Sequence, residues 1–277
     1  MAKKIFLFLS IFFSLAAMSQ SVNPAKDWSI SIQLWTFRVW SFHDAVAKAD
    51  SCGIKGIQAF PGQTLGGGWK GGFGPDMSAD DRNAVKAYMK SKGMYFVGFG
   101  VTNAANEDGW RKLFEFAKDM GIPLIVAEPQ DNQWDYVDKL AGEYHIPVAI
   151  HDHPNPSHYW NPDKVTEAMK GHPNIGACAD IGHWARSGLN PVECIKKLGG
   201  AHIWNVHLKD VATFNKTNAD DAIPGKGVID MPAVFQELKN QNYKGSFSIE
   251  HEANWNNNAG DVIEIVKFYG ERVKAVK

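Results

Sequence analysis

Carboxylates and imidazoles follow five successive apolar segments between residues 127 and 252 of this sequence. They stand in Ala127-Glu128-Pro129, His151-Asp152-His153-Pro154, Asp180-Ile181-Gly182-His183, His207-Leu208-Lys209-Asp210 and Glu250-His251-Glu252. Groups of this kind at the ends of apolar segments cost free energy unless they are paired or bind a metal. Their repetition therefore indicates one shared site that binds a metal and transfers protons.

The composition of these segments indicates which ion they would hold. Two glutamates, one aspartate and one histidine form the natural ligand set, drawn from the fourth, sixth, seventh and eighth apolar segments. An oxygen-rich set with one imidazole suits Mn²⁺, Mg²⁺ or Co²⁺ better than a closed structural zinc site, although Zn²⁺ also binds such donors. Taken singly, Glu128 and Asp180 could be helix caps and His207 a hydrogen-bonded core histidine. Their joint occurrence favours the metal site.

Short apolar segments alternate eight times with longer amphipathic ones, which predicts the elements that position these residues. Predicted strands are Ser29–Trp35, Ile54–Phe60, Met94–Phe99, Pro123–Ala127, Pro147–His151, Ile175–Asp180, His202–Leu208 and Ser246–His251. Predicted helices are Phe42–Cys52, Ala79–Lys92, Asp108–Met120, Gln133–Tyr144, Pro162–Lys170, Pro191–Leu198, Met231–Asn240 and Val262–Val273.

Eight strand–helix units in about 250 residues match the size of one (β/α)₈ TIM barrel, an α/β fold in which the active site lies at the carboxyl ends of the strands. Apolar segments such as Pro123–Ala127 suit parallel strands that are buried on both faces. A doubly wound open sheet would need a glycine fingerprint after its first strand, where this chain has Thr36-Phe37-Arg38. We therefore expect a single-domain barrel over residues 20–277.

The first 19 residues have the layout of a secretory signal peptide. Lys3 and Lys4 precede an apolar run that ends near Ala17, and small residues follow. We expect export, most plainly to a bacterial periplasm, and no membrane association after cleavage; an uncleaved N-terminal anchor is the alternative. The 3 cysteines form no disulfide framework. Cleavage removes two lysines and so changes the net charge from −1 to −3, which disfavours nucleic-acid binding.

In this order the motifs resemble the xylose isomerase-like TIM-barrel superfamily, whose members are often called sugar phosphate isomerases/epimerases. Its first strand resembles residues 31–35, its DxxH element Asp180 to His183, its HxKD element His207 to Asp210, its GxGxxD loop residues 224–230, and its last strand residues 245–250. The resemblance covers essentially the whole mature chain. Ketose epimerases and inosose dehydratases of this superfamily bind one divalent metal. The resemblance implies the ligands Glu128, Asp180, His207 and Glu250.

The resemblance also implies a reaction, in which a proton is removed from the carbon beside a carbonyl group. Glu128 and Glu250 would lie on opposite sides of that carbon, one removing the proton and the other returning one or protonating a leaving group. His151, His153, His183 and Lys209 would contact substrate oxygens, and His151 or His153 could instead serve as the acid that protonates a leaving group. Each also has a structural alternative, such as an ion pair of Lys209 with Asp210 or Glu252. Trp35 is one of several tryptophans near strand ends that could stack on a sugar ring.

The sequence leaves several functions to be compared. No phosphate-binding loop is evident, unless the glycines around Gly225 serve, so we expect a non-phosphorylated keto sugar and an isomerase or epimerase. A β-eliminating lyase or dehydratase that acts on 3-keto-glycosides or keto-inositols is the alternative. A sugar-binding module without activity is disfavoured because it would not need the carboxylate pair. DNA-repair endonucleases of the superfamily carry metal-binding histidines after the second and third strands, which are absent here. The oligomeric state, including a homo-oligomer, stays open.

Overall fold

Eight parallel strands close into a barrel in the computed structural model, which describes residues 28–276. In their order around the barrel they are β1 (Ser29–Gln33), β12 (Ser246–Ile249), β9 (Ile203–Leu208), β8 (Ile175–Asp180), β7 (Val148–His151), β6 (Ile125–Ala127), β5 (Tyr95–Thr102) and β2 (Gly56–Ala59). All eight predicted strands are present. The predicted signal segment, residues 1–19, lies outside the described residues.

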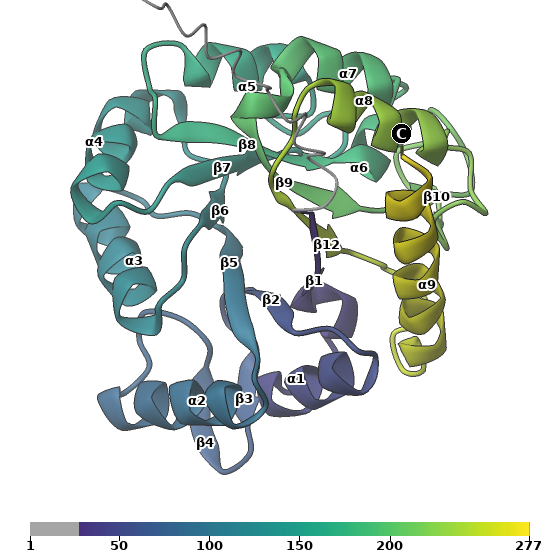
Figure 1. Ribbon diagram of the computed structural model, residues 1–277. Helices are drawn as coiled ribbons and strands as arrows, with labels where there is room; N and C mark the ends of the chain where they lie inside the picture. The colour runs from purple at the N-terminus through teal and green to yellow at the C-terminus, as the bar shows by residue number, and fades with distance from the viewer. Residues whose placement is uncertain (1–27, 277) are drawn as a thin grey trace, which may run out of the picture.

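Helices surround the barrel, as Figure 1 shows. They are α1 (Phe42–Ser51), α2 (Ala79–Ser91), α3 (Glu107–Met120), α4 (Trp134–Tyr144), α5 (Pro162–Met169), α7 (Pro191–Leu198), α8 (Met231–Asn240) and α9 (Ala259–Ala275). The predicted single-domain (β/α)₈ barrel is therefore confirmed. None of the helices in the described part of the chain is long and apolar enough to span a bilayer.

Local sequence explains where these helices begin and end. The α3 helix begins at Asn106, whose side chain accepts a hydrogen bond from the backbone N–H of Gly109. It ends at Gly121, which takes the left-handed conformation (φ 68°) that favours glycine. Between these caps, Trp110 and Phe114 lie on the buried face that packs on the barrel.

Smaller elements lie between the main strands and helices. The segment between Pro61 and Pro75, which follows β2, contains a hairpin of β3 (Thr64–Gly66) and β4 (Trp69–Gly72). A second hairpin joins β10 (Asp210–Val211) to β11 (Asp221–Ala222). The short helix α6 (Ile181–Arg186) follows β8 directly, and 3₁₀ turns cover Leu34–Phe37, Asp131–Gln133 and Gly200–His202.

The barrel interior holds a buried polar layer formed by β1, β9 and β12. Ser31 Oγ and Ser248 Oγ are 2.9 Å apart, and Asn205 donates to Ser248 Oγ over 2.9 Å. In the strand register, Ser248 pairs with His207, and His207 pairs with Asp180 on the next strand. The register alone therefore brings two predicted site residues side by side.

Candidate active site

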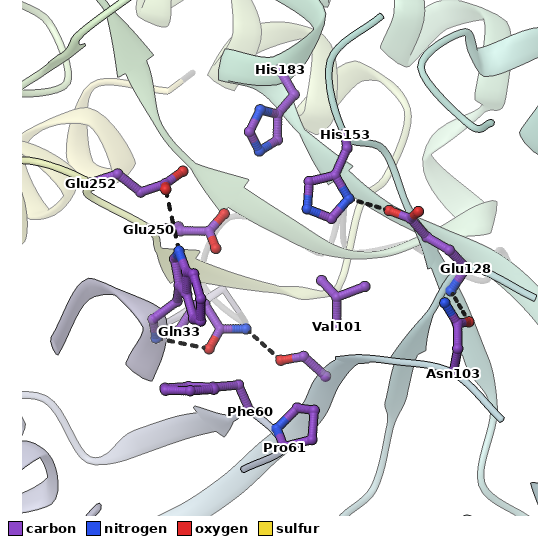
Figure 2. Close-up of a pocket in the computed structure, with 12 residues that line it drawn as sticks. Gln33, Phe60, Pro61, Val101, Asn103, Glu128, His153, His183, Glu250 and Glu252 are labelled. Carbon is purple, nitrogen blue, oxygen red and sulfur yellow. Dashed lines mark hydrogen bonds and ion pairs between the residues drawn. The ribbon is translucent and has the colours of Figure 1, made fainter. Parts of the chain in front are cut away.

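A cavity of about 390 Å³ opens among the loops that follow the strands. Figure 2 shows Glu128 on one side and Glu250 with Glu252 on the other, while His153 and His183 lie along the wall between them. The placement of Glu128 and Glu250 across one cavity matches the arrangement that proton transfer on two sides of a carbon needs.

Asp180 is placed by the junction of β8 and α6. Its Oδ1 accepts a hydrogen bond from the backbone N–H of His183 over 2.8 Å and so caps the short helix. Its Oδ2 is buried and forms no hydrogen bond with any residue that the structure describes. Asp180 is thus a helix cap through one oxygen, and its second oxygen faces the cationic Lys209 Nζ at 3.3 Å.

A buried group of donors surrounds this oxygen. Ligand atoms of His151, Asp180, His183 and Glu250 all lie within 4.8 Å of one another. Within the described residues, His151 Nε2 is also buried without a hydrogen-bond partner. Buried polar atoms without a hydrogen bond cost free energy, and a divalent cation would bind Asp180 Oδ2 and His151 Nε2 at once. The residues present therefore fit a divalent metal ion.

A second group adjoins the first and shares His151. It joins Glu128 to His151 and His153, and it is more exposed to the cavity. His153 Nδ1 makes a short contact with Glu128 Oε1, and His151 Nδ1 lies 3.5 Å from the same oxygen. Glu128 is held from its backbone side as well, because its N–H donates to Asn103 Oδ1 over 3.0 Å.

His207 is level with Asp180 in the strand register and lies beneath Glu250. Its Nδ1 is 2.9 Å from Glu250 Oε2 and 3.6 Å from Asp180 Oδ2, while its Nε2 is 3.1 Å from Gln58 Oε1. The four ligands implied by the resemblance are therefore near one another, yet they do not form one group. Asp180 and Glu250 share a group with His151 and His183, whereas Glu128 belongs to the neighbouring group.

Lys209 is fully buried among the carboxylates of the site. Its Nζ lies 2.6 Å from Glu252 Oε1, 3.2 Å from Glu250 Oε2 and 3.3 Å from Asp180 Oδ2. Burial alone would lower the pKa of this ammonium, but these carboxylates raise it well above its usual value. Lys209 therefore carries a positive charge at neutral pH and neutralises part of the site.

The two glutamates that face each other are both ionised at neutral pH. Burial would raise their pKa values, but neighbouring groups reverse that effect. Hydrogen bonds with His151 and His153 lower the pKa of Glu128 to about 2. The charges of Lys209 and His207 lower the pKa of Glu250 to about 2. Each carboxylate can therefore accept a proton at neutral pH.

The sequence reasoning gave no role to Asp152, which the structure makes a central support. Its Oδ1 accepts a hydrogen bond from the backbone N–H of Asp180 over 2.8 Å. Burial, followed by the charge of Asp180, raises the pKa of Asp152 well above its usual value. Asp152 stands in the His-Asp-His-Pro segment of the sequence, but only the fold shows that its side chain faces β8.

Glu252 also emerges as part of the site. Its Oε2 accepts from Trp35 Nε1 over 3.2 Å, and its backbone N–H donates to Asp221 Oδ2 over 2.6 Å. Arg186 Nη2 pairs with Asp221 Oδ1 over 2.6 Å, which ties α6 to β11. The sequence feature that points to Glu252 is its position two residues after Glu250, because residues two apart lie on the same face of an extended chain.

Trp35 is the tryptophan that lines the cavity. The Gln33 side chain fixes its backbone, since Oε1 accepts from the Trp35 N–H over 3.1 Å while Nε2 donates to the Gly100 carbonyl over 2.8 Å. Phe60 packs edge-on against the indole at 5.1 Å between ring centroids. By contrast, Trp184, which also follows a strand, is buried in the core.

The glycines around Gly225 bind a carboxylate of the protein itself. Asp210 Oδ2 accepts from the backbone N–H groups of Gly225 and Gly227 over 3.0 and 3.1 Å, and Oδ1 accepts from Ile229 N–H. A Cβ on Gly227 would lie 2.3 Å from Asp210 Oδ1, which explains the glycine. Because these N–H groups are already used, this loop offers no cradle for a phosphate.

The comparison with protein families gives one assignment. The family described as "Xylose isomerase-like TIM barrel" matches residues 46–269 of the chain. Among curated proteins, inosose dehydratase of Bacillus cereus (strain AH820) is 28% identical over 158 residues, which cover 48% of this chain and 52% of that protein. Inosose dehydratase of Clostridium botulinum (strain Eklund 17B / Type B) is 38% identical over 87 residues, 26% of this chain and 29% of that protein. The chain thus matches about half the length, or less, of these relatives.

Solved structures share this fold. An uncharacterised protein from Parabacteroides distasonis ATCC 8503 is 33% identical, with a TM-score of 0.72, covering 88% of this chain and 99% of that one. D-allulose 3-epimerase from Methylomonas sp. is 12% identical with a TM-score of 0.69, covering 88% of this chain and 98% of that one, a likeness of fold alone.

Proposed function

This chain belongs to the xylose isomerase-like TIM-barrel family, and on that premise we propose that it is a divalent-metal-dependent enzyme acting on a non-phosphorylated keto sugar. The reaction begins with removal of the proton beside the carbonyl, and it ends in isomerisation or epimerisation when a proton returns. The observation that carries the proposal is the pair of ionised carboxylates, Glu128 and Glu250, on opposite walls of one cavity.

The protein's own residues would perform the proton transfers. One glutamate accepts the proton from the substrate carbon, and the group on the opposite wall returns a proton. That group is Glu128 with His153 if Glu250 is the base, and Glu250 if Glu128 is the base. Trp35 offers an aromatic face to the sugar ring, and His183 points a ring into the same cavity. Asp152 holds the backbone of Asp180, and the positive charge of Lys209 offsets the negative charge of the buried carboxylates.

The metal would be held by the buried donors Asp180, Glu250, His151 and His183, with His207 oriented against Glu250. A divalent ion bound there would polarise the carbonyl and stabilise the negative charge that develops on its oxygen. This help matters because a carboxylate with a pKa of about 2 is a weak base toward carbon.

Elimination is the second candidate reaction. Proton removal beside a carbonyl can be followed by loss of a substituent from the next carbon, as in a dehydratase or a lyase that acts on 3-keto-glycosides or keto-inositols. The curated relatives named inosose dehydratase favour this alternative. His153, which is exposed at the cavity and bonded to Glu128, is placed to protonate a departing oxygen.

Proton NMR in D₂O tests the proposal. Protein loaded with Mn²⁺, Mg²⁺ or Co²⁺ would be incubated with free ketoses and 3-keto-glucosides, and quenched samples would be freed of metal before spectra are taken. We expect deuterium to enter the position beside the carbonyl, or a vinylic signal to appear where a substituent is lost. E128Q and E250Q should each slow this step by about 100-fold or more, the contribution of a positioned acid or base.

The outcomes separate the candidate reactions. Deuterium in a recovered or epimerised ketose supports isomerisation or epimerisation, whereas a vinylic product with a released alcohol supports the lyase. Unchanged rates in both glutamine variants would remove the proposed roles of Glu128 and Glu250. A metal-loaded protein that binds these sugars but exchanges no proton would instead be a binding module.

We also propose that the chain is exported to the periplasm. The support is the N-terminal sequence, in which Lys3 and Lys4 precede an apolar run that ends near Ala17. N-terminal sequencing of protein from fractionated cells should give a mature start near residue 20. A full-length chain in the cytosolic fraction would contradict the proposal.

A further inference from the structure

A second hollow adjoins the cavity of the candidate active site. It has a volume of about 350 Å³, against about 390 Å³ for the first, and Glu128 and Asn103 line both. Because the two hollows share these residues, they form neighbouring compartments on either side of one wall. In Figure 2, Glu128 and Asn103 lie together at the edge of the first hollow, away from Glu250.

The second hollow offers groups that suit sugar hydroxyls. Its lining includes the exposed side chains of Asn103 and Gln130 and the small residues Ala104 and Ala105. The amide nitrogens of Asn103 and Gln130 donate no hydrogen bond to any residue of the described chain. Free amides beside small apolar side chains can bind a polar ring without clashing with it.

This compartment is braced from behind by Gln133, whose buried side chain makes four hydrogen bonds. Its Oε1 accepts from the Gln130 N–H over 3.0 Å and from Trp110 Nε1 over 3.2 Å. Its Nε2 donates to the carbonyls of Ala104 and Ala105 over 3.0 and 3.4 Å. The loops after β5 and β6 are therefore tied together, so the hollow exists before any ligand binds.

From this arrangement we infer that the second hollow is a subsite for a substituent that the keto sugar carries, and that the substrate is a glycoside of two or more units. The inference rests on the proposed function and names its substrate class. With the keto-sugar ring against Trp35 and Glu250, an O-linked second ring would pass Glu128 and reach Asn103 and Gln130.

The same placement accounts for an elimination in which atoms and electrons balance. Glu250 takes the proton from the carbon beside the carbonyl, and the C–H electron pair becomes a C=C bond. The C–O bond to the substituent breaks, and its oxygen takes a proton from His153 and leaves as an alcohol. Solvent then removes the proton from Glu250 and restores the one on His153, so that no oxidant or reductant is needed.

The test compares a small and a large substituent on the same keto ring. The probes are methyl 3-keto-β-glucoside and cellobiose oxidised to the ketone at C3 of its non-reducing ring. Loss of the proton signal beside the carbonyl in D₂O reports exchange and elimination alike, and it gives kcat/KM for each probe. Ala105→Trp fills the hollow, Ala105→Ser is its matched control, and Gln130→Ala removes one amide.

We expect Ala105→Trp to lower kcat/KM for the disaccharide by about tenfold or more, the size of a pocket-shape effect. Its kcat/KM for the methyl glycoside should stay within about twofold of the wild type, which also shows that the variant is folded. Gln130→Ala should change the same ratio in the same direction, and Ala105→Ser should leave it unchanged.

Two other outcomes overturn the inference in distinguishable ways. If Ala105→Trp affects both probes equally or neither, the hollow is no subsite, while activity of the wild type leaves the proposed function standing. If the metal-loaded wild type removes no proton from either probe, the proposed function fails and the subsite fails with it.

Discussion

Asp180 shows how one side chain can satisfy two demands. Its Oδ1 caps α6 and its Oδ2 faces the buried donors, so the helix-cap and the metal-ligand interpretations of the sequence are compatible. A cap holds the carboxylate in one orientation, which lowers the entropy lost when a cation binds. Glu128 is likewise held by a local hydrogen bond, because Asn103 fixes its backbone while its carboxylate faces the histidines.

Lys209 lies at ion-pair distance from two donors of the buried group, so it would compete for them with a metal ion bound there. We expect Lys209→Met to destabilise the metal-free protein by about 3–5 kcal/mol, because carboxylates are left buried and unpaired. Mn²⁺ should then raise the melting temperature more in Lys209→Met than in the wild type. Thermal melts with EDTA and with Mn²⁺ measure both effects.

The control for that experiment is Lys92→Met, which removes a partly exposed cation paired with Asp50 on the surface. It should not alter the response to Mn²⁺. An equal rise in melting temperature for Lys209→Met and the wild type would show that Lys209 does not compete with the ion.

Two histidines distinguish the two donor groups. His183 belongs only to the buried group, and His153 belongs only to the group around Glu128. If the metal occupies the buried group, His183→Ala should weaken Mn²⁺ binding by more than about 100-fold, beyond the effect of losing an outer-shell partner. His153→Ala should change it far less. Calorimetric titration with Mn²⁺ measures the affinities, and the reverse order would place the ion beside Glu128.

At the scale of elements, the loop from Gly225 to Ile229 shapes the end of β9. Its backbone N–H groups converge on Asp210, which begins β10, and the loop leads into α8. The loop therefore positions the strand end that carries His207 and Lys209. The GxGxxD motif is explained by this packing and not by a ligand.

Gly227→Ala tests that explanation. The added Cβ would lie 2.3 Å from Asp210 Oδ1 and 2.5 Å from the Val211 carbonyl, so the loop must shift. We expect the free energy of unfolding to fall by about 1–3 kcal/mol, as for other overpacked sites. Urea unfolding measures this change.

The matched control is Gly270→Ala in the interior of α9, where a Cβ meets no atom within 4 Å. Because alanine favours helix more than glycine does, this variant should gain about 0.5–1 kcal/mol in unfolding free energy. Equal effects of the two substitutions would refute the packing explanation.

At the scale of the whole molecule, the ionised site makes folding sensitive to acid. Glu128 and Glu250 have pKa values of about 2 in the folded protein, against an ordinary value of 4.5. A carboxyl whose pKa is lower when folded stabilises the protein above the unfolded value, and that stabilisation disappears as pH falls through the folded value. Stability should therefore drop between about pH 4.5 and pH 2.

Glu250→Gln should make that decline shallower, because one of the depressed carboxyls is removed. The measurement is the urea midpoint of metal-free protein across this pH range, with wild type beside the variant. A wild-type midpoint that does not change between these pH values would contradict the ionisation state of the whole site.

The sequence by itself determined the barrel. Periodicity and turn residues are local, so they gave all eight strands and eight helices, and strand ends such as Ile175–Asp180 agree to the residue. The helix α6 was missed because six residues carry too little periodicity to detect. The motifs also pointed to the strand ends that supply the cavity, including Glu128, Glu250, His153 and His183.

Only the tertiary structure decided which donors face one another. Barrel closure and strand register bring His151 to Asp180, place His207 beneath Glu250, and bury Lys209 among three carboxylates. Asp152 and Glu252 likewise gain their roles from residues far along the chain. The physical reason is that a side chain's direction follows from its own strand, whereas its partners depend on how distant strands are aligned.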